Sequence, residues 1–183
     1  MANTVTNVAV GKPNVNGALY VASTSATLPT NATATLTGFT SLGYVSDDGA
    51  VNSFDIDTTE IKAWGLDTVW AGVTGKTITW DTTLIEVLNV DVLKTVFGAS
   101  NVSGTLSTGI ALTVNNEEPD EHAVVIDMVL RGNLKRVVLP RAKVTDIADI
   151  TYKDDEVVGY EVTFTAFPDT SGNSQYEYIV EES

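Results

Sequence analysis

The stretch TITWDTTLIEVLNVDVLKTVFG, residues 77–98, changes its period in the middle. In its first half, apolar and polar residues alternate, which is typical of a strand with one buried face. From Asn89 onward the apolar spacing becomes helical. A helix of two turns is unstable alone in water, so the predicted helix, Val90–Phe97, must pack on a sheet. Its expected core anchors lie on one face: Leu93, Val96 and Phe97.

The residues at the two ends of this helix support its predicted limits. Asn89 is a suitable N-cap, and Asp91 lies in the first turn, where the helix dipole favours an anion. Gly98 can adopt the positive φ that often follows a helix. The stretch therefore predicts one strand followed directly by one short helix.

Short alternating segments and turn signals fill most of the remaining chain. Asp48-Gly49 is a strong hairpin signal, and residues 65–67 and Gly132-Asn133 mark further turns. The clearest alternation of apolar and polar residues runs through 158–166. Many strands with one helix predict a mainly β protein: an antiparallel β-sandwich or barrel with one short flanking α-helix.

Other segments carry little sign of a core. Residues 1–17, rich in Asn, Val and Gly, are expected to form an N-terminal arm, and residues 18–183 a single β-sandwich domain. Residues 23–40 are a Thr, Ala and Ser tract without apolar periodicity and predict a long loop, either functional or a plain surface insertion. Residues 176–183 form a C-terminal segment with a last strand and an acidic tail.

Composition excludes several classes of protein. The 183 residues include no Cys, so disulfides and thiolate metal sites are impossible. The first residues lack the features of a signal peptide, and no apolar run is long enough to cross a membrane, so we expect a cytoplasmic product that does not bind membranes. A net charge of −14 argues against a protein that grips nucleic acid, because phosphate contacts need Lys and Arg.

The sequence holds no recognisable constellation for catalysis. His122 is the single histidine, and it is expected on the surface of an acidic loop, which leaves no basis for a triad or a histidine metal site. Neighbouring acidic residues are read as solvated turns, and no phosphate-binding or dinucleotide loop is present. We therefore expect no enzyme activity, no catalytic residue, no metal and no cofactor.

Charge is unevenly distributed along the chain. Half of the basic residues lie in one predicted hairpin, whereas residues 47–60 contain five acidic residues and no basic one. Such polarity suits docking of one subunit on the next, although two unrelated solvated faces would give the same pattern. The candidate inter-subunit basic strip comprises Arg131, Lys135, Arg136, Arg141 and Lys143.

Three strings together resemble one protein family: LGYVSDDG at 42–49, TEIKAWGLDTV at 59–69 and TLIEVLNVDVLKTVFGASNV at 83–102. As a set they resemble the major tail (tail tube) proteins of long-tailed bacteriophages with non-contractile tails. The resemblance implies a structural virion protein that self-assembles into stacked hexameric rings and forms the conduit for viral DNA ejection. It also implies other tail proteins at the tube ends, assembly in the host bacterial cytoplasm, and contacts between subunits through the arm, the long loop and the C-terminal segment.

An acidic wall suits such a conduit, because it lets double-stranded DNA slide without specific binding. Asp55 and Asp57 alternate with Phe54 and Ile56, so they should face solvent or a lumen if the apolar residues face the core. The candidate channel-lining acids are Asp47, Asp48, Asp55 and Asp57.

A cell-surface or adhesin-type β-sandwich binding module is the alternative. The Thr and Ala content, the acidic charge and the lack of Cys all suit that class. It requires an export route and predicts a monomer that binds a ligand, whereas the resemblance predicts a polymer.

Overall fold

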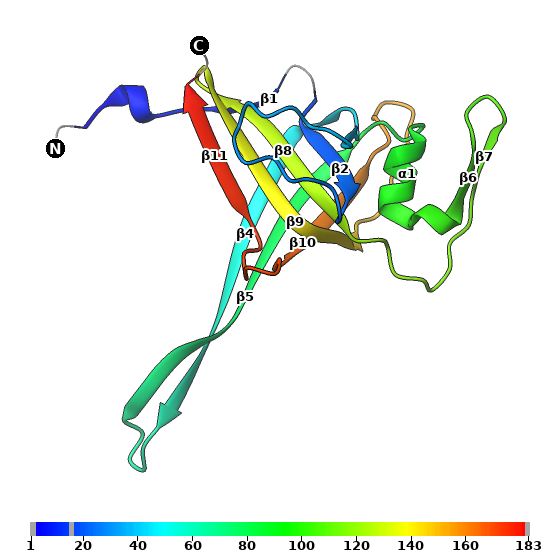
Figure 1. The fold of residues 1–183 in the computed structure, drawn as a ribbon. Helices are drawn as coiled ribbons and strands as arrows, with labels where there is room; N and C mark the ends of the chain where they lie inside the picture. Colours follow the sequence, from blue (N-terminus) through cyan, green and yellow to red (C-terminus); the bar gives the residue numbers. More distant parts are fainter. Residues whose placement is uncertain (1–2, 15–16, 182–183) are drawn as a thin grey trace.

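The computed structural model describes residues 3–14 and 17–181 and shows a mainly antiparallel β protein (Figure 1). A single α-helix occurs in the described part of the chain, so the predicted fold class is confirmed. The elements in chain order are η1 (Val5–Asn7), β1 (Gly11–Pro13), β2 (Leu19–Ser23), β3 (Thr40–Ser41), β4 (Val45–Lys62), β5 (Thr68–Leu84), α1 (Val90–Phe97), η2 (Ala99–Asn101), β6 (Val102–Thr105), β7 (Gly109–Leu112), β8 (His122–Leu130), β9 (Asn133–Ile147), β10 (Tyr160–Phe167) and β11 (Tyr176–Glu181).

Strands β8 and β9 form the centre of the main sheet, whose order is β3-β2-β8-β9-β10-β5-β4. The two short strands β1 and β2 pair with successive parts of one edge of β8. On the far edge of β9, β11 pairs with its first half and β10 with its second half. Residues 123–127 of β8 are all buried, so this almost wholly apolar strand is covered on both faces.

The sheet curls so that its two ends enclose one core. Leu19 of β2 and Ile126 of β8 line a small cavity of about 20 Å³ together with Trp80 of β5 and Phe164 of β10. Trp80 and Phe164 are direct partners in the β5–β10 ladder. Side chains from both ends of the sheet therefore meet in the interior, as in a β-sandwich.

Pro140 lies inside β9. The register shifts between His122 and Val124 of the neighbouring β8, so Pro140 lies in a β-bulge. A bulge leaves a residue outside the ladder, and a strand can then accommodate proline, which has no N–H to donate.

Helix α1 has the predicted limits. The Asn89 side chain accepts a hydrogen bond from the Asp91 N–H at 3.0 Å, and Gly98 has a φ of 92°. Val92 and Val96 are fully buried and Leu93 nearly so, whereas Phe97 is only half buried, with its ring edge-on to Tyr160 at 5.4 Å between centroids. The helix therefore covers the core mainly through its valines and Leu93.

The segment after α1 forms a small hairpin. Strands β6 and β7 pair there as a separate two-stranded sheet. The tight Thr105–Thr108 turn is closed by hydrogen bonds among its hydroxyl groups, which explains why a Ser- and Thr-rich stretch forms a hairpin.

Strands β4 and β5 form one long hairpin that projects from the body of the molecule (Figure 1). The hairpin turn predicted at Asp48-Gly49 is wrong: β4 runs through these residues, and a register shift between Val45 and Ala50 accommodates them as a bulge. The chain reverses instead at the second predicted turn, where the Ala63 N–H donates to the Asp67 carbonyl oxygen.

The described residues contain no helix long and apolar enough to span a membrane.

Candidate functional site

The outer part of the β4–β5 hairpin has no layer packed on either face. Strand β10 pairs with β5 only along residues 78–84, so the hairpin beyond Ile78 has no further strand beside β5. Phe54 and Ile56 are 50% and 56% exposed, so the condition that these residues face the core is not met within the single subunit. The large apolar side chains exposed along the outer hairpin are Phe54, Ile56, Ile61, Trp64, Leu66, Val69, Trp70 and Val73.

The strand register assigns these side chains to two faces. Asp55 and Asp57 share a face with the Ile61–Trp70 pair, and Phe54 and Ile56 lie on the opposite face. The Trp70 ring lies against Gly72, where a Cβ atom would collide with it. Glycine at this position therefore leaves room for the indole over the neighbouring backbone of β5.

The candidate channel acids do not form one cluster. Asp47 and Asp48 line a hollow of about 450 Å³ with acids from the other end of the chain, whereas Asp55 and Asp57 are exposed on the hairpin. The Ser46 hydroxyl lies 3.3 Å from Asp47 Oδ1 and 3.1 Å from Asp48 Oδ2. Among the described residues no group of His, Asp or Glu is arranged to hold a metal ion.

The candidate basic strip is largely neutralised inside the subunit. Lys135 pairs with Glu177 at 2.8 Å, Arg141 with Glu121 at 2.9 Å and Lys143 with Glu118 at 2.7 Å. The hydrogen bond from Lys143 lowers the pKa of the Glu118 carboxyl. Arg131 Nη1 donates to the carbonyl oxygens of Val5 and Val8 and so holds the N-terminal arm. The three ion pairs leave little free positive charge at Lys135, Arg141 and Lys143, whereas the bonds of Arg131 to neutral carbonyl oxygens do not neutralise its charge.

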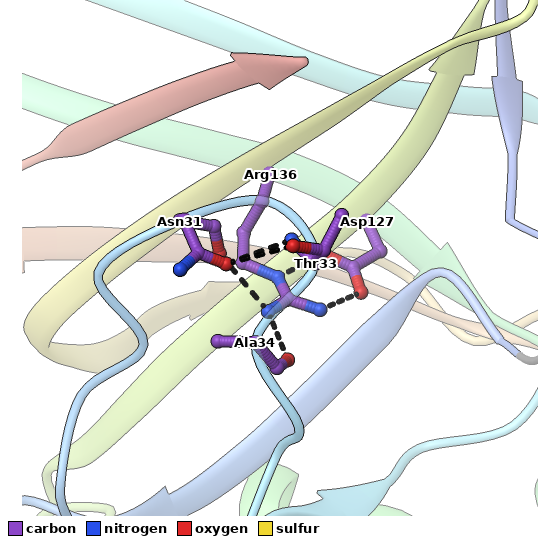
Figure 2. Close-up of polar contacts among 5 residues, drawn as sticks. All are labelled: Asn31, Thr33, Ala34, Asp127 and Arg136. Atoms are coloured by element: carbon purple, nitrogen blue, oxygen red, sulfur yellow. Dashed lines mark hydrogen bonds and ion pairs between the residues drawn. The ribbon is translucent and has the colours of Figure 1, made fainter. Parts of the chain in front are cut away.

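Arg136 is not a surface residue, and its place in the strip is wrong. It is 5% exposed and forms a two-pronged pair with Asp127, with Nε–Oδ1 and Nη2–Oδ2 distances of 2.7 Å (Figure 2). Its Nη1 also donates to the carbonyl oxygens of Asn31 and Ala34, at 3.3 and 2.6 Å. Arg136 therefore ties the central strands to the segment between β2 and β3.

His122 also differs from its predicted surface position. It opens β8 and is half buried, and its Nε2 atom is buried without a hydrogen-bond partner. Burial lowers the pKa of this imidazole, although Asp120 opposes the shift. With no second histidine and no nearby nucleophile bonded to it, His122 gives no sign of a catalytic group.

Two comparisons with known proteins bear on the family of this chain. A search of the curated proteins found no match. A family model described as phage tail tube protein matches residues 4–183, nearly the whole chain. The chain belongs to the phage tail tube protein family. It is a structural component of the phage tail, and its family implies assembly with itself and with other tail proteins.

The sequence did not indicate that two of the three tryptophans of this tail tube protein would be exposed on the outer hairpin. Of the three tryptophans, Trp80 is buried and donates its Nε1–H to Gln175 at 2.9 Å, whereas Trp64 is fully exposed at the hairpin turn and Trp70 is half exposed. The signal for this surface in the sequence was the presence of Trp64 and Leu66 at the predicted turn, where large apolar side chains have no core to enter.

Proposed function

We propose that this chain is the repeating subunit of a tail tube made of stacked hexameric rings, through which viral double-stranded DNA is ejected. The observation that carries the proposal is the outer β4–β5 hairpin, whose large apolar side chains are uncovered on both faces. A two-stranded ribbon alone is marginally stable in water, and a contiguous apolar surface marks an interface. Neighbouring subunits supply the cover.

Three further segments extend the contact surface in this proposal. They are the N-terminal arm (1–17), the long loop (23–40) and the C-terminal segment (176–183); residues 1–2, 15–16 and 182–183 lie outside the described part of the chain. In the arm, Val5, Val8 and Val10 are all largely exposed, which suits a segment that contacts a neighbour. Subunits assemble in the host bacterial cytoplasm, and other tail proteins close the tube ends.

Electron microscopy of the purified protein tests this function. The wild-type chain should form rings or tubes of uniform diameter at high concentration. The double variant Trp64→Ser/Leu66→Ser should stay folded but lose assembly, because both side chains are exposed in the single subunit. Tyr152→Ser/Val157→Ser removes two other exposed large side chains, away from the hairpin, and should still assemble. A wild-type protein that stays monomeric at every concentration would refute the proposal.

A further inference from the structure

An apolar groove with a basic margin lies where the N-terminal arm crosses the β8–β9 turn. Its volume is about 570 Å³, and its lining consists of Val8, Val10, Lys12, Val129, Arg131 and Gly132. The turn is built from Arg131 and Gly132, which have φ values of 52° and 83°. Two consecutive positive φ values are typical of the tight turn that joins twisted strands. Sequence had placed this turn one residue later, at Gly132-Asn133.

The groove is built into the fold at this place. β1 pairs with the end of β8, from Met128 to Leu130, and this pairing fixes one side of the arm. Arg131 fixes the other side by donating from Nη1 to the Val5 and Val8 carbonyl oxygens at 2.7 and 3.2 Å. Val8 and Val10 nevertheless remain about 70% exposed, at 69% and 72%, so apolar surface stays open on the groove wall.

The groove and the hairpin turn lie at opposite ends of the molecule. Figure 1 shows the β8–β9 turn at the end that also carries the C-terminus, and the β4–β5 turn at the far end of the projecting hairpin. One subunit therefore cannot place its own hairpin turn in its own groove. A second copy can, and the contact would join unlike surfaces head to tail.

We propose that the groove receives the hairpin tip, residues 60–67, of a second copy of this chain, with Trp64 and Leu66 seated against the valines. This inference rests on the proposed function and names the surface that its hairpin contacts. Trp64 and Leu66 are 107% and 80% exposed, and the groove is the apolar hollow at the other end of the fold. A buried aromatic anchor in an apolar pocket is typical of the residues that dominate an interface.

Charge favours the same pairing. Lys12 and Arg131 stand on the groove, whereas the outer hairpin from 55 to 76 carries four carboxylates against two lysines. Cations beside an exposed indole also attract its ring face. Because tip and groove are different surfaces, every bound copy offers a free tip or a free groove. Such a heterologous contact either closes into a ring or continues into an open-ended assembly, and the second outcome is the one that a stacked tube requires.

Cysteine cross-linking tests this contact, because the natural chain contains no Cys. The single variants Leu66→Cys and Val10→Cys are purified, mixed in equal amounts at an assembling concentration and oxidised. We expect a disulfide-linked dimer as the main product of the mixture and little from either variant alone. Leu66→Cys mixed with Leu106→Cys, which is exposed on the β6–β7 turn, is the matched control and should give little dimer.

The outcomes separate this inference from the proposed function. Tubes without the Leu66–Val10 cross-link, or with the control link instead, would overturn the groove contact and leave the tube function standing. A dimer from Leu66→Cys alone would indicate tip-to-tip contact and also overturn it. Monomers with no cross-link would remove both proposals. Trp64→Cys with Val8→Cys provides a second pair, and circular dichroism verifies that each variant is folded.

Discussion

Arg136 shows how a single residue holds together parts of the chain that lie far apart in sequence. Its guanidinium is surrounded by two carboxylate oxygens of Asp127 and the carbonyl oxygens of Asn31 and Ala34. Burying a charge is costly unless its hydrogen-bonding capacity is satisfied. Here the Asn31 and Ala34 carbonyl oxygens accept the hydrogen bonds of Arg136 Nη1. The ion pair and the ordering of the segment between β2 and β3 therefore depend on each other.

Replacing Asp127 with Asn should lower the free energy of unfolding by about 3 to 5 kcal/mol, because it leaves Arg136 buried without a counter-charge. Limited proteolysis should also cleave the segment between β2 and β3 faster. Urea denaturation measures the first effect. Glu177→Gln is the control: it breaks the more exposed Lys135 pair and should cost less than about 1 kcal/mol. A loss of similar size in both variants would contradict the structural role assigned to the buried pair.

The Asp127–Arg136 pair could not be predicted from the sequence, because the pairing depends on the exact position of the β8–β9 turn. A turn centred on Arg131 and Gly132 places Asp127 opposite Arg136, as observed. A turn centred one residue later would place Val129 opposite Arg136 instead. Arginine rarely adopts a positive φ, so Gly132-Asn133 was the stronger local signal. Tertiary contacts of Arg131 with the arm outweigh that local preference, and they could not be predicted from sequence.

At the scale of elements, α1 was predictable because its signals are local. The cap at Asn89, the apolar spacing and Gly98 all lie within ten residues, and each agrees with the observed helix. The sequence also indicated which face is buried. It did not indicate how deeply: Phe97 lies at the rim against Tyr160, and Val92, unremarked in the sequence, is fully buried.

Leu93→Ala should cost about 3 kcal/mol of unfolding free energy, because Leu93 is 5% exposed and its loss leaves a cavity between helix and sheet. Leu88→Ala, one residue before the cap and 62% exposed, is the matched control and should change stability by about 0.5 kcal/mol or less. Phe97→Ala should fall between the two. Thermal denaturation of the three variants checks this order, and equal losses from Leu88 and Leu93 would show that the helix is not packed as described.

The hairpin was less predictable because its burial is not decided within one chain. Alternation in β4 correctly indicated a strand, but it does not tell whether Phe54 and Ile56 face a core of the same subunit or a neighbour, and in the single subunit they are exposed. The Asp48-Gly49 signal failed for a related reason. Continuous pairing of β4 with β5 and a bulge at these residues outweigh the local turn preference.

For the whole molecule, the two faces of the hairpin suggest how a ring would be arranged. Near the body of the molecule, one face of the hairpin is apolar at Phe54 and Ile56 and the opposite face is acidic at Asp55 and Asp57; the acidic face becomes apolar only farther out, at the Ile61–Trp70 pair. If neighbours cover the apolar face, the carboxylates face the lumen and repeat around the axis. A narrow channel focuses the field of such repeated charges, so its wall repels a polyanion more strongly than an open surface does.

Asp55→Lys/Asp57→Lys should therefore leave the subunit folded, with a stability change of about 0.5 kcal/mol or less. Its tubes should retain DNA at low salt and release it at high salt, because each new phosphate contact releases counterions, and infectivity should fall. Asp154→Lys/Asp155→Lys makes the same charge change on an exposed turn and should leave DNA retention at the wild-type level. If both variants retain DNA equally, net charge alone is responsible, and Asp55 and Asp57 belong on the outer wall. Retention by the hairpin variant alone would instead assign this face of β4 to the channel.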